Sequence, residues 1–324
     1  MKITLVGCRG FGRVHLNAYT ELRKEEIGKD LEIYVFSRTE EFAKECMKEF
    51  DANGYFTSYD DVLKSDANII DLVVSHDAHE TMGVKAMQAG KNVMIEKPIA
   101  RTEEEAQSLI NTSIKKGVKF MVLENHYFDP TVWKAKELMA SLGKISLIIV
   151  RNTRRNSPPG WRRDKRLMGG GALIDGGIHY IDTMLNLGGE YSEIKGLCKN
   201  TFSGLEGEDT SGGIFNFKGG YLGIFMYSWA SKSENFSHFE IYGERGSIKE
   251  DGVIYSGKPY GNLIVDIEGI KEKMIQIEKI NTVKEEIKGF INALIHNNEV
   301  PMNPKIALRD LIAVREIYRQ CGEI

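Results

Sequence analysis

The sequence of 324 residues has little of what marks several protein classes. Its apolar runs are all shorter than the roughly 18 residues that a membrane span needs, so we expect no transmembrane helix. Basic and acidic side chains nearly balance, 43 against 46, for a formal net charge of −3. This balance argues against the broad basic surface that nucleic-acid binding requires. Seven prolines and an ordinary glycine content exclude a collagen-like or largely disordered chain.

Cysteine is scarce as well. The four cysteines lie far apart and form no CxxC pair: Cys8, Cys46, Cys198 and Cys321. We expect buried thiols of a reducing compartment in place of a disulfide or zinc framework, and no metal site. The first residues already have a strand-like pattern, which leaves no room for a signal peptide. We therefore expect a cytoplasmic protein, with two domains because the length exceeds one comfortable core.

Short apolar runs alternate with helical patterns through the first 123 residues. Strands are expected at Ile3–Val6, Leu31–Phe36, Ile69–Val74, Asn92–Ile95 and Lys119–Leu123, and helices at Gly12–Lys24, Glu40–Phe50, Asp77–Ala89 and Thr102–Lys116. This alternation is typical of βαβ units, so residues 1–123 are predicted to form a doubly wound, parallel Rossmann sheet. Such sheets bind ligands at the carboxyl ends of their strands.

From about residue 144 the strands follow one another with glycine-rich turns between them. They are expected at Ile145–Val150, Ile194–Phe202, Gly213–Phe217, Tyr221–Trp229 and Phe236–Tyr242, followed by helices at Val283–Asn297 and Ile306–Gln320. Successive strands joined by short turns favour antiparallel pairing. Residues 124–324 are therefore predicted to form an α/β domain on an open, mostly antiparallel sheet, with the final helices packing back on the first domain.

A glycine-rich turn lies between the first expected strand and the first expected helix. It contains Gly7, Arg9, Gly10, Phe11 and Gly12. Glycines at this point allow a tight turn and a close approach of the backbone to a pyrophosphate at the helix N-terminus. The spacing departs from GxGxxG, because Arg9 occupies the middle glycine position. An ordinary tight turn is the alternative, but its place in the pattern favours a dinucleotide site.

The end of the next strand bears on which dinucleotide binds. An acidic residue there would bond the ribose 2′-hydroxyl of NAD, and this chain has Ser37 and Arg38 instead. A hydroxyl and a guanidinium suit a 2′-phosphate, so NADP is favoured over NAD. The alternative is an arginine that is merely exposed to solvent after a strand.

Several motifs together resemble the Gfo/Idh/MocA oxidoreductase family, named for glucose–fructose oxidoreductase and inositol dehydrogenase. They are Glu96-Lys97-Pro98, the segment Ser75 to His79, Glu124-Asn125, Gly160-Trp161-Arg162, Tyr242 to Ser247, and the glycine-rich segment Gly169 to Asp182. The last resembles the family pattern GG-x-L-x-D-x-G-x-H-x-x-D. Two departures are Val74-Ser75 in place of Thr-Pro, and Tyr127 where many members have Arg.

The resemblance implies a site and an assembly. It implies catalytic residues Lys97, Asp175 and His179, and further cofactor contacts from Ser75, His76, His79, Glu96, Lys97, Asn125, Trp161 and Arg162. It implies a polyol or sugar substrate, and a homodimer or homotetramer formed through the C-terminal sheet. His76 and His79 have a ligand-like spacing, but no further ligands accompany them, so a cofactor-lining or helix-start role is favoured.

The chemistry can also be argued from the residues themselves. Asp175 and His179 are four residues apart and Asp182 is three further on, so all three share a face if Gly169–Gly171 open a helix. A carboxylate beside an imidazole can orient it and tune its pKa for general-base work. Lys97, at the end of a parallel strand, can hold a substrate oxygen. The alternatives are a surface lysine, a capping aspartate and an interior histidine.

The stretch 151–166 is rich in basic side chains. It holds Arg151, Arg154, Arg155, Arg162, Arg163, Lys165 and Arg166, opposed there only by Asp164. A solvated charged face is one interpretation. A loop that attracts an anionic substrate or a cofactor phosphate is the other.

The sequence therefore predicts an NAD(P)-dependent oxidoreductase that interconverts a secondary alcohol and a carbonyl on a sugar, cyclitol or related polyol. Two alternatives stay open. One is an NAD-dependent glycosidase with tightly bound cofactor, and the other is a sensor of dinucleotide or sugar that does not catalyse. The presence of Lys97, Asp175 and His179 together argues against the sensor, because catalytic residues would be surplus there.

Overall fold

The computed structural model describes residues 1–201, 204–231, 238–251 and 260–323. The chain divides into two compact units, one of residues 1–125 with 281–309 and the other of residues 126–280 with 310–324. The last two helices are therefore distributed over both units. In the described part of the chain, no helix combines the length and apolar character needed to cross a bilayer.

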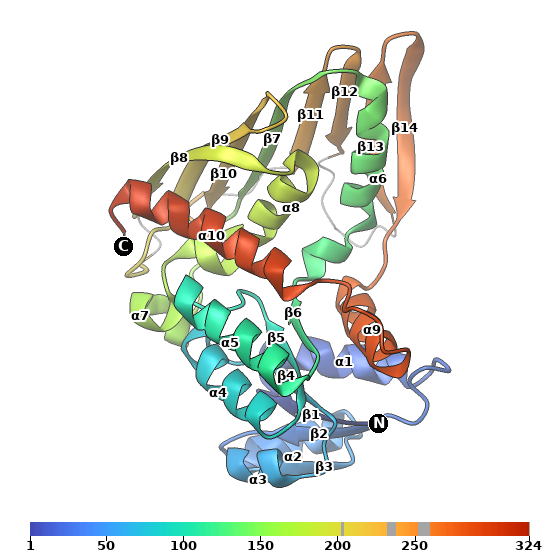
Figure 1. Ribbon diagram of the computed structural model, residues 1–324, viewed down its shortest axis with the longest axis vertical. Coiled ribbons are helices and arrows are strands. Elements are labelled where there is room, and N and C mark those ends of the chain that lie inside the picture. Colours follow the sequence, from blue (N-terminus) through green and yellow to red (C-terminus); the bar gives the residue numbers. More distant parts are fainter. Residues whose placement is uncertain (202–203, 232–237, 252–259, 324) are drawn as a thin grey trace. The chain divides into compact units, whose positions relative to one another are not determined.

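The first unit is built on six parallel strands in the order β3-β2-β1-β4-β5-β6 (Figure 1). The strands are β1 (Lys2–Val6), β2 (Glu32–Phe36), β3 (Gly54–Phe56), β4 (Ile69–Leu72), β5 (Asn92–Glu96) and β6 (Phe120–Leu123), and the helices are α1 (Gly12–Leu22), α2 (Glu40–Glu49), α3 (Tyr59–Lys64), α4 (His76–Gln88), α5 (Glu103–Lys116) and α9 (Thr282–Ile295). This confirms the predicted Rossmann sheet. The short β3 and α3 were not predicted.

Helices cover this sheet in pairs. Helix α4 packs beside α5, whereas α1 packs beside α9, which comes from far along the chain. Thr102 caps α5 through its side chain, and Gly117 ends the helix in the left-handed conformation. Strands β1, β4, β5 and β6 are buried almost throughout, as expected for a parallel sheet covered on both faces.

The second unit holds eight strands in the order β14-β13-β12-β11-β7-β10-β9-β8. They are β7 (Ile145–Thr153), β8 (Tyr191–Lys199), β9 (Thr210–Phe217), β10 (Leu222–Ser228), β11 (Phe239–Gly243), β12 (Gly246–Glu250), β13 (Tyr260–Ile267) and β14 (Ile270–Glu278). Among the described strands of this unit, only β7 and β10 pair in parallel, so the mostly antiparallel sheet is confirmed. Strands β12 to β14 were not predicted. Phe202 and residues 236–237, which we placed in strands, lie outside the described residues.

Helices α6 (Pro130–Leu138) and α8 (Ile178–Gly188) lie on one face of this sheet (Figure 1). Short helical turns connect the elements: η1 (Asn125–Phe128), η2 (Met139–Leu142), η3 (Gly160–Arg163), α7 (Lys165–Met168) and a π-helical turn, η4 (Leu173–Gly177). The last helix, α10 (Pro304–Cys321), reaches the second unit with its C-terminal part.

The prediction of four free thiols is wrong for two of them. Cys198 on β8 and Cys321 at the end of α10 form a disulfide with a Cα–Cα distance of 5.5 Å. The two residues are 123 positions apart in sequence, and the path of α10 brings them together. Cys8 and Cys46 are free and buried, as expected.

A cluster of buried ionisable side chains lies in the first unit. Nδ1 of His15 lies 2.9 Å from Oδ2 of Asp71, and its Nε2 lies 3.0 Å from Oε1 of Glu96. Burial alone would lower the pKa of His15, but the carboxylate of Asp71 and then that of Glu96 outweigh burial and raise that pKa well above 6.5. Both ring nitrogens therefore act as donors, and His15 carries the positive charge of the cluster.

Glu286 of α9 completes this cluster. Its side chain is fully buried, and its two carboxylate oxygens have no hydrogen-bond partner among the residues that the structure describes. Burial first, and then the nearby Glu96 carboxylate, raise the pKa of Glu286 well above its ordinary value of 4.5. Glu286 is therefore held as a neutral acid at a pH where the unfolded chain would ionise it.

This protonation links stability to pH. The folded state binds a proton that the unfolded state has released, so the contribution of Glu286 to stability falls as the pH rises from about 4.5 toward the raised pKa. Glu286→Gln removes this loss, and each pH unit by which the pKa is raised corresponds to about 1.4 kcal/mol. We expect the variant to unfold at a higher temperature than the wild type at pH 8, with a smaller gain at pH 5. Thermal unfolding at both pH values tests this, with the partly exposed Glu285→Gln as control. An equal effect of Glu286→Gln at both pH values would contradict the interpretation.

Candidate active site

The glycine-rich turn has the geometry of a nucleotide cradle. Gly7 has φ +104°, and a Cβ atom there would lie 2.1 Å from the carbonyl oxygen of Val73. A Cβ atom on Gly12 would lie 1.9 Å from the carbonyl oxygen of Gly7, so neither position accepts a side chain. Gly10 has φ +54° and open space around it. The turn thus brings bare backbone to the N-terminus of α1, and the positive end of a helix dipole is a favourable place for a pyrophosphate.

A cavity opens beside this turn within the first unit. It is lined by Arg9, Gly10, Arg13, Phe42, Glu45 and Cys46. The guanidinium of Arg9 lies over the ring of Phe42, 3.9 Å from its centroid. The predicted residues Ser37 and Arg38 directly follow β2, and Arg38 is exposed. An aromatic ring and arginines near a glycine turn suit the polyanionic and aromatic parts of a dinucleotide.

Lys97 is held at the carboxyl end of β5. Its backbone N–H donates to the carbonyl of Leu123 at 3.2 Å, and the Lys97–Pro98 peptide bond is cis. His79 contacts the residue that follows Lys97, because its Nδ1 lies 2.9 Å from the carbonyl oxygen of Pro98. Burial lowers the pKa of His79 to about 4, so its imidazole is neutral. The turn after β1, Ser37, Ser75 and Lys97 all follow strands of one parallel sheet, and therefore lie at the same edge.

Other predicted cofactor residues of this unit have internal partners. Glu96 is buried against His15, and His76 lies at the start of α4 with its ring 5.6 Å from that of His79. Nδ2 of Asn125 donates to Oγ1 of Thr282 at 3.4 Å. His15, Glu96 and Glu286 each offer a possible ligand atom within 4.8 Å of the others, but both ring nitrogens of His15 are engaged by Asp71 and Glu96.

In the second unit, Asp175 lies in the π-helical turn η4, and its side chain is 7% exposed. Its Oδ2 accepts a hydrogen bond from Nε of Arg162 at 2.8 Å. The guanidinium of Arg162 in turn lies over the ring of Trp161, 4.4 Å from its centroid. The predicted residues Trp161 and Arg162 thus join Asp175 in one local arrangement.

His179 lies in the first turn of α8, and its ring stacks on that of His126 with 4.4 Å between centroids. The helical segment begins at Ala172, directly after Gly169–Gly171, but its first turn is π-helical, so Asp175 and His179 do not have ordinary α-helical spacing. Asp182 is buried and accepts a hydrogen bond from Nδ2 of Asn186 at 2.8 Å. Sequence reasoning missed His126, although its place directly after Glu124-Asn125 was a usable signal.

The basic stretch is largely engaged within the second unit. Arg151 pairs with Glu240 at 2.8 Å and Arg166 with Asp164 at 2.9 Å. Lys165 pairs with Glu323 at 2.5 Å. Two of these partners, Glu240 and Glu323, come later in the sequence and neutralise part of the positive charge of the stretch. Tyr127, the departure from the family pattern, accepts a hydrogen bond from Nε1 of Trp133 at its carbonyl oxygen.

Comparison with known proteins agrees with this geometry. Residues 1–124 match the model of an oxidoreductase family with an NAD-binding Rossmann fold, and residues 132–249 match the Gfo/Idh/MocA C-terminal domain. A levoglucosan dehydrogenase from Pseudarthrobacter phenanthrenivorans is 27% identical over 64% of this chain and 62% of its own length, so the chain spans somewhat less than two thirds of that relative.

Solved structures share the fold over nearly the whole chain. An oxidoreductase from Thermotoga maritima superposes with a TM-score of 0.89, 26% identity, and coverage of 99% of this chain and 97% of its own. A levoglucosan dehydrogenase in complex with NADH and levoglucosan gives a TM-score of 0.88 at 20% identity, covering 100% and 97%. With both of its domains matched, the chain belongs to the Gfo/Idh/MocA family of oxidoreductases.

Proposed function

We propose that the protein is an NADP-dependent oxidoreductase that interconverts a secondary alcohol and a carbonyl on a sugar, cyclitol or related polyol. The observation that carries the proposal is the position of Lys97 at the carboxyl end of β5, at the same sheet edge as the glycine cradle after β1. The similarity to a levoglucosan dehydrogenase supports a carbohydrate substrate. We assign the reaction to the cytoplasm, where the free thiols Cys8 and Cys46 would stay reduced and where thiol reductants could cleave the Cys198–Cys321 disulfide.

The roles follow from the chemistry of each side chain. The bound nicotinamide would accept or donate the hydride. Lys97 would hold the reacting oxygen with its ammonium group, and His179 would take the hydroxyl proton. Asp175 would orient the imidazole, and Arg162 holds that carboxylate in place. A positioned general base and acid of this kind typically contribute about 10²–10⁴-fold to the rate.

Substitution of the two proton-handling residues tests this assignment. Lys97→Ala and His179→Ala should each lower kcat by about 10²–10⁴-fold, because each removes a group that acts on the reacting oxygen. The measurement is the absorbance of reduced nicotinamide over a panel of levoglucosan, aldoses, cyclitols and linear polyols. The exposed Lys115→Ala and His296→Ala serve as matched controls. Full turnover by both active-site variants would refute the assignment.

The same panel separates the two alternative functions. A glycosidase of this fold would release a leaving group with no net reduction of added cofactor, and it would be purified with dinucleotide bound. A sensor would bind dinucleotide and sugar with no turnover. Net reduction of added cofactor by one substrate class excludes both.

Cofactor preference depends on Arg38 in this proposal. A guanidinium bonded to a 2′-phosphate makes a charge-assisted contact that NAD lacks. Arg38→Ala should therefore raise KM for NADP about tenfold, which is the usual scale for one hydrogen bond to a charged group, and leave KM for NAD unchanged. Arg245→Ala, an exposed arginine in the turn between β11 and β12, is the control. Equal effects of Arg38→Ala on both cofactors would exclude a 2′-phosphate contact.

We also propose assembly through the open face of the eight-stranded sheet. Apolar side chains of three neighbouring strands, β8, β9 and β10, are strongly exposed there: Leu197, Ile214, Leu222, Ile224 and Met226. Exposed apolar side chains gathered on adjacent strands are typical of an interface, and a second copy of the chain would cover them.

A charge placed on that face should separate the copies. Ile224→Glu is expected to shift the molar mass from that of a dimer or tetramer to that of a monomer, since burying an unpaired carboxylate is unfavourable. Light scattering after size exclusion measures this. Ile114→Glu on α5, where the isoleucine is 70% exposed, is the matched control. An oligomer that survives Ile224→Glu would place the interface elsewhere.

A further inference from the structure

The hydroxyl of Tyr318 on α10 binds backbone groups just before the proposed catalytic helix. Its oxygen accepts hydrogen bonds from the N–H groups of Gly171 at 3.1 Å and Ile174 at 3.2 Å. It donates to Oε1 of Glu208 at 3.0 Å. The first N–H groups of a helix have no partner within the helix, so Tyr318 supplies one from outside.

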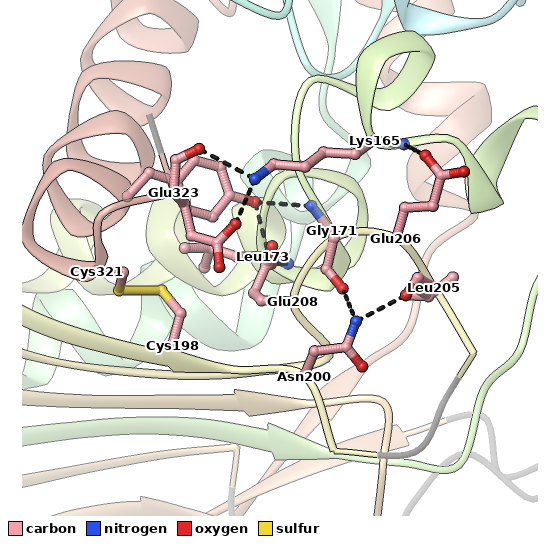
Figure 2. Close-up of polar contacts among 12 residues, drawn as sticks. Lys165, Gly171, Leu173, Cys198, Asn200, Leu205, Glu206, Glu208, Cys321 and Glu323 are labelled. Atoms are coloured by element: carbon pink, nitrogen blue, oxygen red, sulfur yellow. Dashed lines mark hydrogen bonds and ion pairs between the residues drawn. A yellow bond between two sulfur atoms is a disulfide. The ribbon is translucent and has the colours of Figure 1, made fainter.

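Glu208 binds the same segment from the other side. Its Oε1 also accepts the N–H of Leu173 at 2.7 Å, and its carbonyl oxygen accepts the N–H of Ala172 at 2.8 Å. Glu208 is buried, and burial raises its pKa to about 8. Figure 2 shows Glu208 between the α10 side and the backbone of Gly171 and Leu173. Four consecutive residues before Asp175 are thereby bonded to two side chains and one carbonyl.

Steric fit makes this contact rigid. A Cβ atom on Gly170 would lie 2.4 Å from the hydroxyl oxygen of Tyr318, and one on Gly171 would lie 2.3 Å from Oε2 of Glu208. The glycines of the family-like segment are therefore needed for contact with Tyr318 and Glu208. A shift of the tyrosine ring toward Gly170 would therefore have to displace the backbone that leads to Asp175.

The end of α10 is itself fastened at two further points. Cys321, one turn after Tyr318, is joined to Cys198 of β8 by the disulfide. Nζ of Lys165 donates to the carbonyl oxygen of Glu323 at 3.0 Å and to its carboxylate at 2.5 Å (Figure 2). The approach of the helix to β8 is close, because a Cβ atom on Gly196 would lie 2.8 Å from the side chain of Ile317. A chain terminus is usually the first part of a protein to fray, and here a covalent bond opposes fraying.

We propose that Tyr318 and Glu208 are positioning residues for Asp175 and His179, and that the Cys198–Cys321 disulfide keeps Tyr318 in register. The inference rests on the proposed function, in which Asp175 and His179 move the proton. A dithiol reductant would cleave the bond: the disulfide takes up two electrons and two protons to give two thiols, and the reductant becomes a disulfide. The reduced protein retains the Lys165–Glu323 pair but loses the covalent constraint one turn from Tyr318.

Tyr318→Phe tests the positioning role, because it removes only the hydroxyl. We expect kcat to fall about tenfold, on the scale of a sub-ångström misplacement of catalytic groups. Titration of His179, followed by NMR with 13C-labelled histidine and assigned with His179→Gln, should show a changed midpoint. Tyr221→Phe is the matched control: that tyrosine donates to the carbonyl of Gly188 at 2.8 Å, at the opposite end of α8. It should leave both kcat and the His179 midpoint unchanged.

The disulfide is tested by coupling. Dithiothreitol should lower kcat of the wild type several-fold. It should not change kcat of the double variant that combines Cys198→Ser with Cys321→Ser. It should also cause no further loss of kcat in Tyr318→Phe. Unchanged circular dichroism and cofactor-binding stoichiometry establish that the variants are folded. An unaltered His179 titration in folded Tyr318→Phe would overturn the positioning role, and an additive effect of reductant on that variant would overturn the coupling. If the wild type turned over no substrate, the proposed function would be wrong. The titration of His179 would still decide the positioning role, so the two failures can be distinguished.

Discussion

Close approach of bare backbone is the constraint on which both units depend. In the first unit, Gly7 and Gly12 leave no room for a Cβ atom, and the turn between them opens the N-terminus of α1. In the second unit, Gly170 and Gly171 lie directly against Tyr318 and Glu208. In both places a methyl group would overlap existing atoms, so the turn or the loop would have to move. The two glycine segments have similar composition but different surroundings. The first borders a cavity, and the second brings the backbone into contact with Tyr318 and Glu208.

The buried ionisable groups avoid an unpaired charge in different ways, and the way depends on how deeply each group is buried. His15 carries a proton between two carboxylates, Glu286 is held neutral, and Asp175 is bonded to a partly exposed guanidinium. The first two lie in the core of the nucleotide-binding unit, where burial is complete and protonation avoids an unpaired charge. The charge of Asp175 is instead compensated by an ion pair with Arg162, whose side chain is partly exposed.

Much of this fold could be predicted from local pattern. The alternation of apolar runs and helices identified the parallel sheet, because both faces of its strands are buried and the runs are continuous. Strands β12 to β14 were not predicted because charged residues interrupt their apolar pattern. Strand β3 was not predicted because it has only three residues. The pairing of Cys198 with Cys321 could not be predicted, since it depends on where α10 ends in space and not on any spacing in the sequence. The stacking of His126 on His179 was hidden for the same reason.

At the π-helical turn, the chain departs from the α-helical conformation that a helix normally adopts. A π turn is rare, and it persists where surrounding structure supports it. Here Gly176 and Gly177 allow that support, because a Cβ atom on Gly176 would lie 2.0 Å from the hydroxyl oxygen of Tyr227, which accepts a hydrogen bond from Nε1 of Trp229. Aromatic side chains of β10 and its end thus press on one side of the turn, while Tyr318 and Glu208 hold its entry. An extra residue in one helical turn rotates the side chains that follow, so the spacing of Asp175 and His179 in sequence does not have its usual α-helical meaning. The supports around the turn, more than helical periodicity, therefore determine where the carboxylate that bonds Arg162 lies relative to the first turn of α8.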